Sequence, residues 1–232
     1  MERRTLNGPA ATHPCVEVLF GDAPETVRGI EQDFALLDEG RAASHAWTTT
    51  QTAVVLGRSR DLSFEVAMDE CARRGVAILR RTSGGGTVVL GPGTVQYAFV
   101  LPHRHTPTRQ WAASVEPPAL EAVQRACNRA VAALLAECGH RAPIETDGSG
   151  DLRVGDRKVG GLALRRRRDA TLLHGTLLTS SADLDLIAAV LRHPAREPAW
   201  RGGRPHADFL ATLDPFDVAA FVRALPRTNV TI

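Results

Sequence analysis

Lys158 and the glycines beside it are the residues most able to carry chemistry in this sequence. The chain has 28 lysines and arginines, and Lys158 is the only lysine among them. A lysine ammonium is a compact, rotatable charge on a slim stem, whereas the arginine guanidinium is a broad planar fork. Gly160 and Gly161 follow on the same expected strand and leave room beside that stem for a ligand. This pattern predicts a buried lysine beside a ligand, at a place where arginine cannot serve. The alternative is a surface charge retained by chance.

A glycine-rich loop between two expected strands is the second candidate site. Glycines remove the Cβ wall and let backbone amides approach a ligand, and arginines can complement a carboxylate or phosphate. Because a strand follows the loop, it is neither a P-loop nor a dinucleotide fingerprint. The alternative is a glycine-rich hairpin without a ligand, although three adjacent glycines are costly in chain entropy. The candidate residues are Arg80, Arg81, Ser83, Gly84, Gly85 and Gly86.

Two further groups lie in the segment around Lys158, residues 150–178. His174 ends a buried-looking strand. A histidine in such a place is more often a satisfied core group than a catalyst. The run Arg165–Arg168 is expected to be a solvated turn, and the alternative is a surface that docks an acidic partner.

Hydrophobic periodicity and breaker residues predict helices and β-hairpins around these groups. Helices between hairpins, without strict strand–helix alternation, indicate an α+β fold with a mixed, largely antiparallel sheet. A link with several prolines is expected over 107–118. Helices are expected over 23–40, 63–74 (with Ser63 as cap), 119–138, 182–191 and 215–225, and strands over 52–57, 76–81, 94–102, 152–154, 158–164 and 170–178.

Composition excludes several classes of protein. The 232 residues carry a net charge of +2, which argues against a nucleic-acid partner. No stretch approaches the roughly 20 apolar residues that span a bilayer, and no apolar run follows the charged N-terminus, so neither a membrane anchor nor a secretory signal is expected. Four cysteines without CxxC spacing indicate neither a disulfide framework nor a zinc site. We therefore expect a reduced, cytoplasmic protein with a loose tail over 1–15.

The two candidate segments together resemble the lipoate–protein ligase and octanoyltransferase family. RRTSGGG before a strand, followed some seventy residues later by DRKVGGLALRRRRDATLLHGTLL, carries the resemblance. It extends to TAVVLGRSRDLSFEV (52–66) and RPHADFLATL (204–213). The resemblance implies a biotin/lipoate ligase catalytic domain of the class II synthetase-like fold, with helices flanking a mixed sheet and the ligand in a tunnel over it. The resemblance also implies that ligases often carry an extra C-terminal domain of about a hundred residues, and for this chain we expect a single catalytic domain over 16–232 without it.

Roles are implied only where residues match the family. Lys158 matches the lysine that contacts the carboxyl or acyl-phosphate oxygen, and the glycine loop matches the one that covers the acyl-adenylate. Gly160, Gly161 and His174 belong to the same implied binding set, and Asp151 matches an acidic position near the nucleotide. The chain departs from the family at Gly150, where asparagine is usual, and at Leu90, where a histidine is frequent. Metal ligands are left open.

The resemblance implies an enzyme that joins lipoate or octanoate to a lysine, using ATP and Mg²⁺ to form an acyl-adenylate. The implied acceptor is a lipoyl domain: that of a 2-oxoacid dehydrogenase acyltransferase subunit, a glycine cleavage H protein or a similar protein. A separate accessory-domain polypeptide is a further expected partner. The main alternative, a transferase that draws on acyl carrier protein or a lipoylated donor, needs a cysteine nucleophile. Residues 145–157 and 179–205, where that cysteine is expected, contain none. Two further hypotheses are a biotin ligase and a lipoate-binding protein without catalysis.

Overall fold

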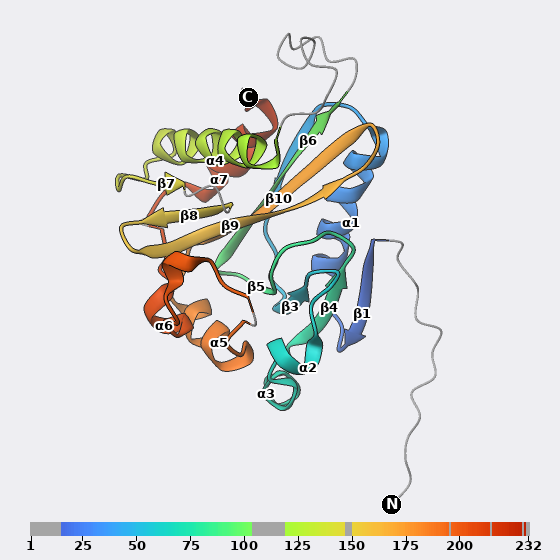
Figure 1. The fold of residues 1–232 in the computed structure, drawn as a ribbon, viewed down its shortest axis with the longest axis vertical. Helices are drawn as coiled ribbons and strands as arrows, with labels where there is room; N and C mark the ends of the chain where they lie inside the picture. Colours follow the sequence, from blue (N-terminus) through green and yellow to red (C-terminus); the bar gives the residue numbers. More distant parts are fainter. Residues whose placement is uncertain are drawn as a thin grey trace, which may run out of the picture.

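The computed structural model describes residues 15–103, 119–146, 150–194, 196–213, 215–228 and 230. The expected link over 107–118 and residues 1–14 of the expected tail lie outside these ranges. Cys15, the one described residue of that tail, is 7% exposed and packs in a core cluster. The described residues form two β-sheets with helices around them (Figure 1).

The larger sheet has six strands in the order β2-β6-β10-β9-β8-β7, and every neighbouring pair is antiparallel. Its centre is the β6–β10 pair, and β6 is buried along its whole length. Burial on both faces explains why its sequence is almost continuously apolar. The four strands expected in this sheet are confirmed, whereas β2 and β7 were not expected. The strands are β2 (Ala43–Trp47), β6 (Thr94–Pro102), β7 (Glu145–Thr146), β8 (Asp151–Val154), β9 (Arg157–Arg166) and β10 (Ala170–Leu178).

The smaller sheet has four strands in the order β1-β4-β3-β5. β3 and β4 are parallel, while β1–β4 and β3–β5 are antiparallel. With this parallel pair the molecule has mixed sheets and a largely antiparallel topology, so the expected α+β class is confirmed. Its strands are β1 (Val16–Phe20), β3 (Ala53–Leu56), β4 (Ala77–Arg81) and β5 (Val88–Leu90), of which β1 and β5 were not expected.

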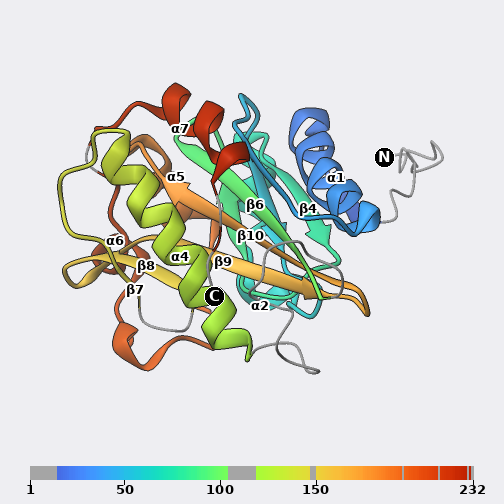
Figure 2. The same ribbon diagram turned by 90° about the horizontal axis from the view of Figure 1, so that it is seen from above.

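Helices cover both sheets and enclose the core. α1 (Pro24–Glu39) buries an apolar stripe against strands of both sheets and ends at Gly40, whose φ of 64° suits glycine. α4 (Leu120–Glu137) and α7 (Val218–Ala224) cover the opposite face of the six-stranded sheet (Figure 2). α5 (Ala182–Val190) and α6 (His206–Phe209) pack beside the smaller sheet. Two 3₁₀ turns, Ala199–Arg201 and Leu225–Arg227, complete the described elements.

The single helix expected over 63–74 is wrong, because the chain breaks there into α2 (Leu62–Glu65) and α3 (Met68–Arg74). Val66 is extended, 1% exposed, and forms a β-bridge with Leu191 after α5. This tertiary pairing overrides the local helical pattern. The cap also differs from expectation, since Asp61 accepts the hydrogen bond from the Ser63 amide.

The arginine run is only partly the solvated turn that was expected. β9 continues through Arg166, so the first two arginines belong to the strand. Arg165 donates to the carbonyl of Thr82 at 2.8 Å, and Arg167 forms an ion pair with Asp38 of α1. The turn itself is therefore confined to residues 167–169, and the run helps to join β9 to other elements.

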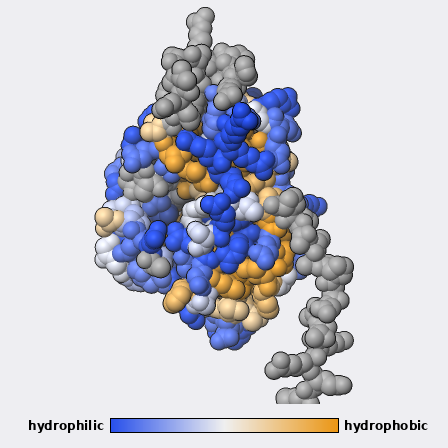
Figure 3. All heavy atoms as spheres, turned by 45° about the vertical axis from the view of Figure 1, so that its right-hand side comes forward, coloured by the Kyte–Doolittle hydropathy of each residue, from blue (hydrophilic) through white to orange (hydrophobic). Residues whose placement is uncertain are grey.

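None of the helices in the described ranges is long and apolar enough to cross a membrane. The face in Figure 3 is mainly hydrophilic, with apolar residues gathered in separate areas. The large apolar side chains that remain exposed among the described residues are Val18, Phe20, Phe64, Met68 and Leu120. Most other large apolar side chains are in three buried clusters that surround the two sheets.

Candidate active site

A cavity of about 440 Å³ lies between the two sheets. Its walls come from the glycine loop and β5 on one side, from β6, β9 and β10 on another, and from the segment around α5 and α6 at one end. Of the predicted site residues it brings together Arg81, Gly85, Gly86, Asp151, Lys158, Gly160, Gly161 and His174. The other three predicted site residues, Arg80, Ser83 and Gly84, do not line the cavity. Leu90, where the sequence departs from the family pattern, does line it.

Lys158 is held in the cavity by Asp151. Its Nζ lies 2.6 Å from Asp151 Oδ1, and the two side chains are 29% and 10% exposed. Lys158 is therefore half-buried, not fully buried as expected. A Cβ at Gly161 would lie 3.0 Å from Asp151 Oδ1 and from Lys158 Nζ, so glycine makes room for the ion pair itself. A Cβ at Gly160 would lie 2.8 Å from the carbonyl oxygen of Thr176, so this glycine permits close strand packing.

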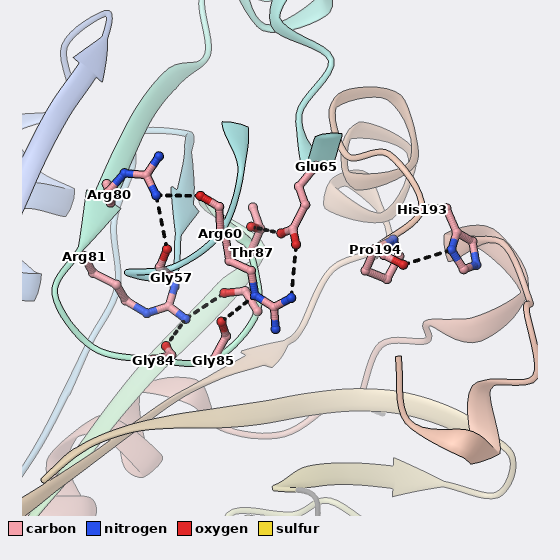
Figure 4. A network of polar contacts seen from close by, with 11 residues as sticks. Gly57, Arg60, Glu65, Arg80, Arg81, Gly84, Gly85, Thr87, His193 and Pro194 are labelled. Carbon is pink, nitrogen blue, oxygen red and sulfur yellow. Dashed lines mark hydrogen bonds and ion pairs between the residues drawn. The ribbon is translucent and has the colours of Figure 1, made fainter. Parts of the chain in front are cut away.

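Arg81 holds the glycine loop from beneath. It is 4% exposed and donates through Nη2 to the carbonyls of Gly84 (2.9 Å) and Gly86 (2.7 Å), as Figure 4 shows. Its Nη1 donates to Val55 on β3 at 3.0 Å. Burial, with the positive charge of Arg60 second, lowers the pKa of Arg81 to about 10, so the guanidinium still carries its charge at neutral pH. Arg81 therefore positions the loop through its backbone.

Arg60 and Glu65 complete the support of the loop, and sequence reasoning missed both. Arg60 donates through Nε to the carbonyl of Gly85 at 2.9 Å and pairs with Glu65 at 3.2 Å (Figure 4). Glu65 is 5% exposed and also accepts a hydrogen bond from Thr87. Arg80 fixes Arg60 in turn, donating to its carbonyl at 2.6 Å. The only signal in the sequence is that these residues lie in the family-like segment 52–66.

The carbonyls of three successive glycines thus face two guanidinium groups. In a trans peptide the N–H points away from the C=O, so the amides of Gly85, Gly86 and Thr87 point away from the arginines. These three residues line the cavity. Successive amides on one side of a loop form a concavity that binds anions. Gly85 is required there, because its φ is +88° and a Cβ would lie 2.7 Å from the Cβ of Ala163.

Ser83, His174 and Asp33 form a buried chain of polar contacts behind the loop. Ser83 Oγ lies 2.7 Å from His174 Nε2, and His174 Nδ1 lies 3.5 Å from Asp33 Oδ2. Burial lowers the pKa of His174, which outweighs the opposing effect of Asp33. A neutral His174 accepts from Ser83 and donates toward Asp33, the order of groups in a hydrolase triad. Ser83 is 0% exposed and does not line the cavity, so the arrangement fixes the loop and offers no nucleophile to a substrate.

The end of the cavity near α5 and α6 is strongly cationic. Arg192, Arg196, Arg201 and His206 line it together with Lys158. Burial, followed by the charges of Arg201, His193 and Lys158, lowers the pKa of His206 to about 4, so this imidazole is neutral at neutral pH and the positive charge of this end comes from the arginines and Lys158. Arg201 is 4% exposed, and its Nη2 has no hydrogen-bond partner among the described residues. Guanidinium and ammonium groups gathered in this way suit phosphate oxygens. Sequence reasoning assigned no role to Arg201 or His206.

The four cysteines, all described, are free, and none lines the cavity. Burial raises the pKa of Cys15 to about 11 and that of Cys127 to about 12, and it also raises the pKa of Cys71 and Cys138. A cysteine nucleophile works as the thiolate, which a raised pKa disfavours. The structure therefore gives none of these thiols the setting of a catalytic cysteine.

The described residues contain no group of three or more histidine, cysteine or acidic side chains that could hold a metal ion. Three carboxylates, Asp33, Glu65 and Asp151, line the cavity, and Glu65 and Asp151 are each in an ion pair with a basic side chain. Mg²⁺ is commonly bound through one or two carboxylates together with substrate phosphates. Asp151, beside the cationic end, fits that limited role once a phosphate competes for Lys158.

Comparison with known proteins gives the family. The model of the lipoyl protein ligase A/B catalytic domain matches residues 34–216. Lipoate–protein ligase 1 of Staphylococcus aureus is 25% identical over 181 residues, which cover 76% of this chain and 50% of that protein. Lipoate-protein ligase A of Psychrobacter cryohalolentis is 28% identical over 137 residues, which cover 58% of this chain and 34% of that protein. The chain spans between about a third and just over half of the length of the curated relatives that it matches.

Solved structures give the same fold. A structure of a bi-partite lipoate protein ligase and its E2 lipoyl domain from Thermoplasma acidophilum superposes with a TM-score of 0.67 at 21% identity, covering 90% of this chain and 79% of that chain. A lipoate-protein ligase A bound with ATP superposes with a TM-score of 0.54 at 23% identity, covering 79% of this chain and 69% of that chain. At these identities the likeness supports the fold, with a cavity between its two sheets.

Proposed function

The chain belongs to the lipoyl protein ligase A/B catalytic-domain family, and from this premise we propose that it is an ATP-dependent lipoate–protein ligase. It would activate lipoate or octanoate as the acyl-adenylate and transfer the acyl group to a lysine of a lipoyl domain. One observation carries the proposal: a single cavity joins Lys158, the glycine loop and a cationic end. A carboxylate, an α-phosphate and a leaving pyrophosphate each need such partners.

In the first step a carboxylate oxygen of the acid attacks the α-phosphorus of ATP, and the bond to pyrophosphate breaks. Lys158, released from Asp151, offsets negative charge on the carboxylate and the α-phosphate. The amides of Gly85 and Gly86 hold the anionic part of the adenylate, and Arg201 faces the departing pyrophosphate. Fixed charges and dipoles of this kind supply most of the acceleration when no protein nucleophile takes part. Mg²⁺ on the phosphates, held by Asp151, would supply further charge neutralisation.

In the second step the acceptor amine attacks the acyl carbonyl, AMP leaves, and an amide forms. The protein then needs only to position the adenylate and admit the acceptor lysine. We propose a lipoyl domain as acceptor, carried by a 2-oxoacid dehydrogenase acyltransferase subunit, a glycine cleavage H protein or a similar protein. A separate accessory polypeptide is a further proposed partner, since a structural neighbour is described as bi-partite and the chain spans only part of its relatives. Free, buried cysteines fit a cytoplasmic location.

The transferase alternative finds no support at the cavity. It needs a nucleophile that can reach a thioester donor, and the four cysteines lie away from the cavity with raised pKa values. Ser83, whose hydroxyl lies 2.7 Å from His174 Nε2, is fully buried.

The test is incubation of the chain with lipoate, ATP, Mg²⁺ and a lipoyl-domain acceptor, followed by intact mass and AMP release. We expect acylated acceptor and AMP in equal amounts, with neither formed when ATP is left out. A second series adds the accessory domain of a longer relative. Modification of the acceptor from octanoyl carrier protein without any nucleotide would overturn the assignment.

A further inference from the structure

A β-bulge in β9 lies between Lys158 and the glycines that follow it. The pairing of β8 with β9 shifts its register between Leu152 and Arg153. Leu152 pairs with Gly160, whereas Arg153, the next residue of β8, pairs with Lys158. Val159 is skipped by this pairing and is the extra residue of the bulge. Because bulges re-aim side chains, the direction of the lysine depends on this register.

The bulge turns Lys158 away from the apolar core and into the cavity. Side chains of a regular strand alternate between the two faces of a sheet. A Cβ at Gly160 would lie 3.0 Å from a side-chain carbon of Leu177, in the apolar cluster that packs between the large sheet and α4. Val159 is 0% exposed and belongs to the same cluster, so two successive residues face it. Lys158 consequently lines the cavity on the opposite face, and a slip of one residue would direct its charge into the core.

Residues 210–211 hold the other edge of β9 at Lys158, beyond the point where β10 stops pairing with it. Leu210 forms a parallel β-bridge with Lys158, and the amide of Ala211 donates to the carbonyl of Lys158 at 2.9 Å. The lysine thus has a backbone neighbour on each edge of its strand, Arg153 on one side and Leu210 on the other.

The ring of Trp200 connects the two segments that flank the lysine. The guanidinium carbon of Arg153 lies 4.9 Å from the centroid of the Trp200 ring. The ring of Phe209, in the segment on the far edge of β9, has its centroid 4.5 Å from that of Trp200. Arg204 places a second guanidinium carbon 5.7 Å from the Trp200 ring. A cation over an aromatic face and a pair of aromatic rings are both attractive, so these contacts tie β8 to the far segment with the lysine between them.

We propose, resting on the ligase function above, that Trp200 is a positioning residue for Lys158. Its ring joins Arg153 on β8 to the segment on the far edge of β9, and this clamp keeps the bulge in the register that directs the ammonium into the cavity. Trp200 itself does not line the cavity, so it acts through the lysine and not on a ligand. Without the ring, Lys158 should leave its place beside Asp151 about tenfold more often, the size expected when cation–π and aromatic contacts are lost.

The test uses the fact that Lys158 is the only lysine of the chain. An acetylating N-hydroxysuccinimide ester is added to the whole folded chain, and acetylation of Lys158 is followed by digestion and mass spectrometry, which separate it from the terminal amine. Trp200→Leu removes the ring, and Trp200→Phe keeps an aromatic face. Arg153→Met removes the cation instead and takes the place of Trp200→Leu if that variant does not fold. The matched control, Phe216→Leu, removes a ring from an aromatic pair with Phe221 that does not line the cavity.

We expect Lys158 to be acetylated about tenfold faster in Trp200→Leu than in the wild-type chain, at a temperature well below both unfolding transitions. Trp200→Phe should recover most of the wild-type rate, and Phe216→Leu should equal it. A wild-type rate in folded Trp200→Leu, or in Arg153→Met where that variant replaces it, overturns the inference. Equal acceleration in Phe216→Leu overturns it as well, because the effect would then follow general stability.

The second readout is ATP-dependent acylation of a lipoyl-domain acceptor. The kcat of Trp200→Leu should fall about tenfold while KM for lipoate changes less than about threefold, because a misplaced lysine affects the transition state more than the binding of the acid. Unchanged kcat in this variant would overturn the positioning role and leave the ligase function intact. Absence of turnover in the wild-type chain would refute the ligase function instead, and the acetylation rates would still decide whether Trp200 holds the lysine.

Discussion

Replacement of Lys158 tests the chemistry of the cavity most directly. Lys158→Ala removes the ammonium that lies between the expected carboxyl and phosphate, and loss of one preorganised charge contact costs on the order of 3–4 kcal/mol in the transition state. Turnover should therefore fall by about 10²–10³-fold. Lys158→Arg retains the charge and changes only the shape. Asp151 Oδ1 lies only 2.6 Å from Lys158 Nζ, so a broad planar guanidinium on a longer side chain does not fit there without displacing this carboxylate.

The assay is AMP release with saturating lipoate, ATP and acceptor, with the unfolding temperature measured on the same samples. Arg125→Lys, on the exposed face of α4, is the matched control and should leave turnover unchanged. We expect kcat of Lys158→Arg to fall at least about tenfold, because the wide guanidinium group cannot place its charge where the lysine ammonium lies. Near-normal turnover of Lys158→Arg would refute the reasoning from shape, and Lys158 would then be a replaceable charge.

Three other predictions concern the loop, the thiols and the cationic end. Gly85→Val should weaken lipoate binding by about tenfold or more in calorimetry, because valine is strained at φ +88° and meets Ala163; unchanged affinity would make the loop a structural turn only. Serine at all four cysteine positions should lower the unfolding temperature but leave the turnover of folded enzyme largely intact, and abolished turnover would revive the transferase mechanism. The pKa of His206 is lowered from 6.5 to about 4 in the folded chain, so between these pH values the unfolded chain binds a proton that the folded chain does not. The free energy of unfolding therefore decreases as pH falls from about 6.5 to about 4. Unfolding temperatures at pH 5 and pH 7.5 should differ less in His206→Gln than in the wild type, and an equal difference would contradict this.

The sequence predicted the elements whose burial is uniform or strictly periodic. The long strands β6 and β10 and the helix α4 have continuous or regular apolar patterns, and all three are present with nearly the expected bounds. β2 was missed because its residue types are determined by contacts with residues far away in the sequence. Ser44 donates to the carbonyl of Leu225, and His45 faces Asp33 of α1, so the strand shows neither apolar continuity nor clean alternation.

The candidate site divides in the same way. Lys158 and the glycine loop were identifiable because a lone lysine and a triple glycine are unusual in composition. Arg60 and Glu65 were not, because their importance comes from contacts across the fold. Arg60, for example, donates to the carbonyl of Gly85, which is 25 positions away in sequence. Ordinary residue types in ordinary patterns give no signal of this kind before the sheets bring them together.

The setting of Lys158 bears on whether the proposed acyl-adenylate would acylate the protein that forms it. Acyl-adenylates are electrophiles that modify exposed amines without guidance. The only lysine of this chain is half-buried in the cavity, paired with Asp151 at 2.6 Å, and in the proposed reaction it exchanges this carboxylate for the anionic oxygens of the substrates. An ammonium group has no free electron pair with which to attack a carbonyl. The other 27 basic positions are arginine, which does not form stable amides under these conditions. Under the proposed function, a chain of this composition releases an activated acyl group toward its acceptor while its own side chains resist self-acylation.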